Sequence, residues 1–155
     1  MKNNSNHILL NEVFTATRDG RRFFDYAASQ IDNAELKILF SRIALVKSEI
    51  MTDLASELIG ILSEGSLRAS PEMKWSSEFS STYENIRPLI GSREFENWGP
   101  LVDSEARFLA IMEKTLLDKK ISVNTRAVLT KYTPEIRTCS ELLKKHHFIP
   151  MRKVA

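Results

Sequence analysis

Apolar residues recur at helical spacing along most of this chain of 155 residues. Four long stretches place them three or four positions apart, which is the period of an amphipathic α-helix. These stretches run over residues 6–31, 33–63, 100–118 and from 122–124 to 147. No segment shows the strict alternation of a half-buried strand. The pattern therefore predicts an all-α protein.

Single residues refine this picture at three places. Asp32 is expected to cap the second helix, with Glu35 three residues later as in a capping box. Gly20 falls on the inward face of the first helix, where the missing side chain is expected to let a neighbouring backbone come close. Pro134 falls inside the fourth helix, where its missing amide predicts a kink or a restart capped by Thr133.

Residues 64–99 break the pattern and are predicted to form a long crossover. Ser70 followed by Pro71 predicts the start of a shorter surface helix over 71–90. The join between the first two helices is only two or three residues long, so these helices should form an antiparallel hairpin. The single predicted domain consists of a hairpin over 6–63, the crossover, a hairpin over 100–147 and a tail over 148–155. This is the arrangement of a ferritin-like four-helix bundle.

Composition narrows the class of protein. The net charge is only +2, so the chain lacks the basic excess of a nucleic-acid-binding protein. Cys139 is the only cysteine, which excludes an intramolecular disulfide, and its apolar surroundings indicate a core residue rather than a nucleophile. No apolar run approaches the roughly 18 residues of a membrane span, and residues 1–7 lack the apolar core of a secretory signal. We therefore expect a cytoplasmic protein without membrane partners, with a homodimer as the simplest assembly.

Two charged residues stand on apolar helix faces. Glu105 lies at the centre of the apolar face of the third long helix, and Lys47 lies close to the centre of the second. A buried carboxylate is costly unless it is paired, hydrogen-bonded or bound to metal. We therefore expect Lys47 and Glu105 to form a buried ion pair, with Tyr132 or Thr17 completing its hydrogen bonds. In the alternative, Lys47 extends its stem along the bundle and keeps its amine in water.

A metal centre is another use of inward carboxylates. Di-iron and di-manganese centres in such bundles take about four carboxylates and usually two histidines, each three residues after a glutamate. None of His7, His146 and His147 follows a glutamate at that spacing, so the standard motif is absent. The remaining candidate ligands for iron or manganese form an unusual, carboxylate-rich set: Asp19, Glu49, Asp53, Glu105 and Glu135.

Residues 10–54 carry a distinctive set of residue pairs. These are Asp19-Gly20, Phe23-Phe24, Ala27-Ala28, the turn from Asn33 to Lys37, and Leu39-Phe40. With these features the stretch resembles the opening helical hairpin of a small bacterial ferritin-like family of uncharacterised function. The resemblance implies a ferritin-like bundle and a link to stress.

The second half departs from that family at several positions. Tyr83 stands where the family's crossover helix usually has a tryptophan. Glu105 is similar to the first acid of the family's Glu-Arg-Gly-Glu-Asp stretch, but the next acid falls on Phe108, and the fourth-helix histidine falls at or next to Cys139. These departures favour a non-enzymatic protein whose metal site is degenerate. Two alternatives stay open. One is a di-metal oxidoreductase or iron-binding protein, and the other is a module that binds a helix or an apolar ligand in a cavity lined by Phe24, Phe108, Met112 and Tyr132.

Overall fold

The computed structural model of the chain describes residues 4–63, 77–92 and 97–148. Within these ranges the chain forms five α-helices and one 3-10 helix, with no strand, so the all-α prediction is confirmed. The elements are α1 (Asn4–Gln30), α2 (Ala34–Ser63), α3 (Ser80–Ile86), η1 (Arg87–Leu89), α4 (Gly99–Leu117) and α5 (Val123–Phe148). In the part of the chain so described, no helix is both long and apolar enough to cross a membrane.

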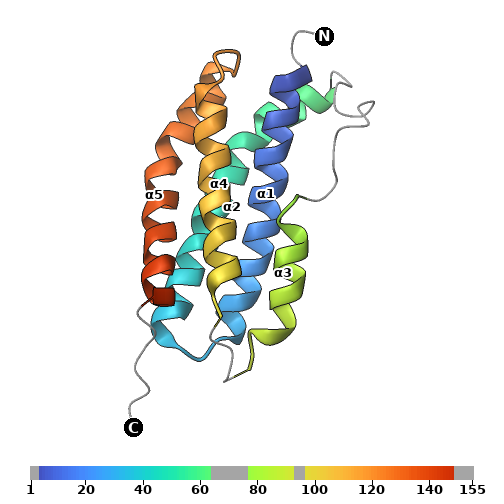
Figure 1. Cartoon of the computed structure of the whole chain (residues 1–155). Helices are drawn as coiled ribbons and strands as arrows, with labels where there is room; N and C mark the ends of the chain where they lie inside the picture. The colour runs from blue at the N-terminus through green and yellow to red at the C-terminus, as the bar shows by residue number, and fades with distance from the viewer. Residues whose placement is uncertain (1–3, 64–76, 93–96, 149–155) are drawn as a thin grey trace.

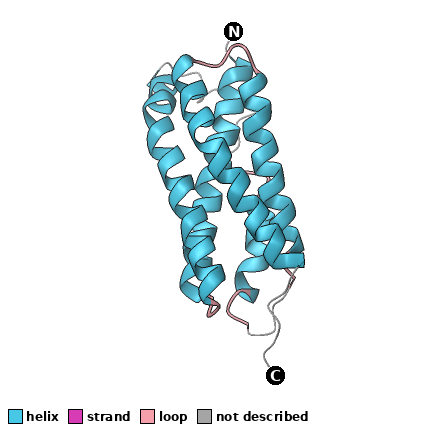
Figure 2. Cartoon of the chain, turned by 90° about the vertical axis from the view of Figure 1, so that its left-hand side faces the viewer, coloured by secondary structure: helices cyan, strands magenta, loops and turns pink. Residues whose placement is uncertain are grey.

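The four long helices stand side by side as a bundle (Figure 1). Contacts link α1 to α2, α2 to α5, α5 to α4 and α4 back to α1, which closes a ring around a shared interior. The short α3 lies outside this ring and packs against α1 and α4. Figure 2, turned by 90°, shows that the axes of the long helices are roughly aligned.

Each long helix buries one apolar face in the interior. Removing such a side chain from water stabilises the fold by about 1.5–3 kcal/mol. Fully buried residues at the centre of the core include Val13 and Phe24, Phe40 and Ile43, Leu101 and Met112, and Leu129 and Leu143. The helical period in the sequence thus places the core correctly on all four helices.

The start of α2 differs from the sequence prediction by one residue. Asn33, not Asp32, caps the helix: its Oδ1 atom accepts a hydrogen bond of 3.0 Å from the backbone amide of Leu36. The carbonyl of Asn33 also accepts the first helical hydrogen bond, from Lys37. Both residues are good caps by type, and Asn33 takes the role because its side chain is the one in reach of the third helical amide.

Pro134 neither ends nor restarts the last helix, so the predicted restart capped by Thr133 is wrong. A single helix, α5, runs through it. Proline removes only one amide donor, and both Pro134 and Thr130, whose carbonyl would have accepted that bond, lie exposed on the outside of the bundle. The hydroxyl of Thr133 donates instead to the carbonyl of Leu129 within the same helix.

The expected crossover helix is not continuous, because residues 77–79 are not helical. The predicted range of 71–90 is described only from residue 77, and there α3 and η1 cover residues 80–89. The predicted cap at Ser70 and Pro71 lies outside the described residues. Tyr83 of α3 is buried and stacks on Phe23 of α1, with ring centroids 4.8 Å apart. The short helix therefore covers the seam between α1 and α4 with an aromatic side chain.

Candidate functional site

A lysine and a glutamate meet inside the bundle. Lys47 comes from α2 and Glu105 from α4, and Nζ of Lys47 lies 3.2 Å from Oε1 and 3.3 Å from Oε2 of Glu105. The Lys47 side chain has no exposed surface, and that of Glu105 is 2% exposed. The structure therefore brings together the two charges expected to pair, and the amine of Lys47 does not reach solvent.

Aromatic rings surround the ammonium group. Its nitrogen lies 3.5 Å from the ring centroid of Phe108 and 5.8 Å from that of Phe24, and ring faces attract cations. Burial lowers the pKa of Lys47 because water no longer stabilises the charge, while the charge and hydrogen bonds of Glu105 oppose this effect. One carboxylate and two rings thus hold a positive charge at the centre of the core.

Gly20 of α1 leaves the space that the lysine occupies. A Cβ atom at this position would lie 2.9 Å from Cδ, 3.0 Å from Cε and 3.1 Å from Nζ of Lys47. The space that was expected to admit a neighbouring backbone holds the Lys47 side chain. Three helices therefore build the site, with α1 contributing the missing side chain, α2 the cation and α4 the anion.

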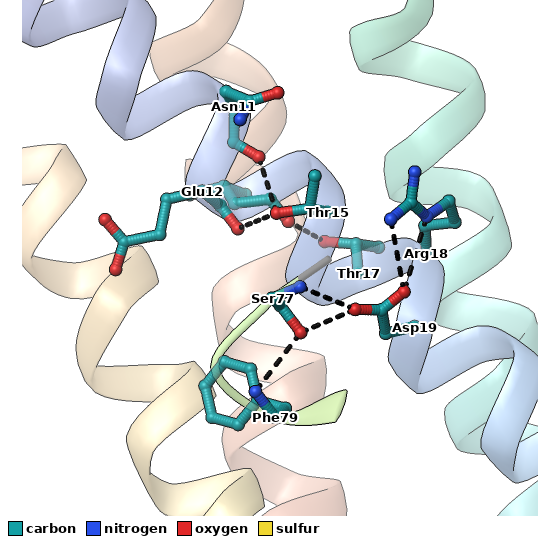
Figure 3. Close-up of polar contacts among 9 residues, drawn as sticks. Asn11, Glu12, Thr15, Thr17, Arg18, Asp19, Ser77 and Phe79 are labelled. Carbon is teal, nitrogen blue, oxygen red and sulfur yellow. Dashed lines mark hydrogen bonds and ion pairs between the residues drawn. The ribbon is translucent and has the colours of Figure 1, made fainter. Parts of the chain in front are cut away.

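Neither residue expected to complete the hydrogen bonds of the pair does so. The hydroxyl of Tyr132 donates to Oδ2 of Asp53 at 2.6 Å, which is a contact between α5 and α2. This hydrogen bond raises the pKa of Tyr132 to about 12. The hydroxyl of Thr17 donates to the carbonyl of Val13, one turn earlier in α1 (Figure 3). The predicted cluster of Lys47, Glu105 and Tyr132 is therefore reduced to its ion pair.

The five carboxylates considered as metal ligands do not converge. Asp53 and Glu49 both lie near the hydroxyl of Tyr132, and Glu105 faces Lys47. Glu135 pairs with Arg42, whose hydrogen bond lowers the pKa of Glu135. Among the residues that the structure describes, no group of three or more histidine, cysteine, aspartate and glutamate side chains could hold a metal ion.

Asp19, the fifth of these carboxylates, fixes the start of the crossover helix (Figure 3). Its Oδ2 atom accepts hydrogen bonds from the backbone amide of Ser77 at 2.8 Å and from the Ser77 hydroxyl at 2.7 Å. Its Oδ1 atom pairs with Arg18, and the Ser77 hydroxyl oxygen accepts a hydrogen bond from the amide of Phe79. Asp19 therefore acts as a clamp between α1 and the chain that leads into α3.

Two buried hydroxyls beside the ion pair were not expected from the sequence. The side chains of Tyr83 and Ser104 interact with one another, but neither hydroxyl has a hydrogen-bond partner of good geometry among the described residues. Burial, together with the nearby charge of Glu105, raises the pKa of Tyr83 well above its usual value. Ser104 precedes Glu105 on the inward face of α4, and that position was the available signal for its burial.

A second feature is an open cleft of about 160 Å³ on the surface between α1 and α3. Charged side chains line much of it, among them Asp19, Arg22, Glu84 and Arg87. The residues expected to line an apolar cavity are instead buried in the core: Phe24, Phe108, Met112 and Tyr132. The cleft is therefore distinct from the interior site of the ion pair.

Comparison of the chain with protein-family models, with curated proteins and with solved structures gives no significant match. The family suggested by residues 10–54 therefore remains a prediction.

Proposed function

We propose that this chain is a non-enzymatic, ferritin-like bundle protein in which the ammonium group of Lys47 takes the place of a metal cation. The observation that carries the proposal is the contact of Lys47 Nζ with both carboxylate oxygens of Glu105 in the closed interior. A carboxylate held this way becomes a metal ligand only if the pair breaks. Breaking a buried pair costs about 3–5 kcal/mol.

The other candidate ligands support the same proposal. Three of these four carboxylates have a partner of their own: Tyr132 donates a hydrogen bond to Asp53, Arg42 pairs with Glu135, and Ser77 donates to Asp19. The fourth, Glu49, lies near the same Tyr132 hydroxyl. A di-metal centre would require several of these contacts to be given up at once. The stress-related role and the family membership rest on the resemblance of residues 10–54 alone.

The test is metal content, measured by inductively coupled plasma mass spectrometry on untagged protein after loading with Fe(II) or Mn(II). Glu105→Ala is compared with Glu113→Ala, which removes a half-exposed carboxylate from the same helix. We expect no stoichiometric metal in the wild type. One or two ions per chain, lost in Glu105→Ala and kept in Glu113→Ala, would instead establish the di-metal alternative.

A further inference from the structure

The outer side of α2 carries a row of large apolar side chains in solvent. Ile38 is 70% exposed, Leu45 is 60% exposed and Ile59 is 61% exposed. The three positions follow a seven-residue repeat, in which Thr52, also exposed, takes the remaining place. A seven-residue repeat keeps residues on one face when two helices coil around each other. At 1.5 Å per residue the row extends over about 32 Å.

Small residues lie beside this row. Ser41, Ser48 and Ala55 each follow a position of the repeat by three residues. The distance between two packed helices depends on the side chains at their contact, so short side chains here permit a close approach. Another helix could therefore pack closely along the length of this row.

The surface charges of α2 differ between its two halves. The first half carries Lys37 and Arg42, of which Arg42 pairs with Glu135 of α5. Its only acid, Glu35, contacts His146 of α5. The charges on the described surface of the second half are all acidic: Glu49, Asp53 and Glu57. Two copies of α2 in parallel would place the acidic halves together, whereas antiparallel copies place the half that carries Lys37 against the acidic half of the other copy.

We propose that a second copy of this chain packs on this face, with the two α2 helices antiparallel about a two-fold axis. Ile38 then lies opposite the partner's Ile59, and Leu45 lies opposite the partner's Thr52. The axis passes close to Ser48 and Glu49. Such a contact is self-complementary and closes at two subunits. The proposal goes beyond the role of the ion pair and does not depend on it.

The first test is the oligomeric state of the full chain, measured by sedimentation velocity over the micromolar range. We expect a dimer for the wild type and a shift toward monomer for Leu45→Glu, with association weakened by about tenfold or more, since a charge then enters the contact. Because Leu45 is exposed, the variant should keep the helical circular dichroism of the wild type. The matched control is Leu117→Glu at the end of α4, where the side chain is 81% exposed, and it should remain a dimer.

The second test is the orientation, measured by disulfide formation between single-cysteine substitutions on α2. Leu45→Cys and Thr52→Cys should each fail to cross-link alone and should cross-link when mixed, because the two positions face each other only in the antiparallel pair. Native Cys139 is buried and does not interfere. Cross-linking of each variant alone would overturn the antiparallel pairing. A monomeric wild type would overturn self-association and leave this face to a different protein partner.

Discussion

Removing either charge of the interior pair should destabilise the protein strongly, because the remaining charge is then buried with neither a partner nor water around it. Glu105→Leu leaves the Lys47 ammonium group among aromatic rings, and Lys47→Met leaves the Glu105 carboxylate buried at 2% exposure. Each change should lower the free energy of unfolding by about 3–5 kcal/mol. For a chain of this size that corresponds to a fall in Tm of about 6–20 °C.

The proton of Lys47 sets an upper limit on one of these costs. In Glu105→Leu the lysine can avoid a buried, unpaired charge by losing its proton. With the ordinary lysine pKa of 10.5, removing this proton costs about 4.8 kcal/mol at neutral pH. The neutral amine would still lack its hydrogen-bond acceptor, which adds about 1–3 kcal/mol.

The double variant should behave in the opposite way. Lys47→Met combined with Glu105→Leu replaces the pair by apolar side chains of similar volume, and such replacements are neutral or stabilising by about 1–4 kcal/mol. The assay is urea unfolding followed by far-ultraviolet circular dichroism, with the m-value checked for constancy. The control is Glu113→Leu, which breaks the half-exposed pair with Arg137 and should cost at most about 1 kcal/mol. Single variants as stable as the wild type, or a double variant as unstable as the sum of the singles, would refute the reasoning.

Three further predictions follow from the contacts. Gly20→Ala should destabilise the wild type, because its methyl group would lie 2.9 Å from Lys47 Cδ. In a Lys47→Ala background the same change should stabilise the protein by about 1 kcal/mol through helix propensity. Equal effects on the free energy of unfolding in both backgrounds would contradict this prediction. Asp19→Ala removes the acceptor of both Ser77 hydrogen bonds and should cost about 1.5–3 kcal/mol in urea unfolding, and an unchanged midpoint would show that the clamp contributes nothing. Burial raises the pKa of Cys139 to about 12, so the thiol stays protonated at mildly alkaline pH and should react with a disulfide reagent only after denaturation; rapid reaction of the native protein would contradict its burial.

The sequence located the charges of the site because helical period gives each residue a direction. Lys47 and Glu105 are both central on apolar faces, so two inward charges of opposite sign could be paired before any contact was known. The helical period does not give the axial offset between neighbouring helices. Tyr132 also points inward, yet its hydroxyl meets Asp53. Thr17 satisfies its hydroxyl within its own helix, an option that threonine has on any helix.

The crossover was the least predictable part. The position of Tyr83 depends on where α3 docks, and that docking relies on the contact of Asp19 with Ser77, which are 58 positions apart in the chain. A contact between residues so far apart in the sequence cannot be predicted from the local spacing of apolar residues. The candidate metal ligands lie apart for a related reason, because Asp19 and Glu135 each have a partner on a different helix or segment.

The position of α3 also determines how often water reaches the interior of the bundle. This helix has seven residues, too few to be stable by itself, and it is attached to the bundle by the Asp19 clamp and by the Tyr83 ring. It is therefore the element that should open first while the long helices stay folded, and its amides should exchange hydrogen faster than those of α1 and α2. Each such opening would bring water to Ser104 and, next to it, Glu105. The lifetime of the water-free ion pair should thus be set by the opening rate of α3.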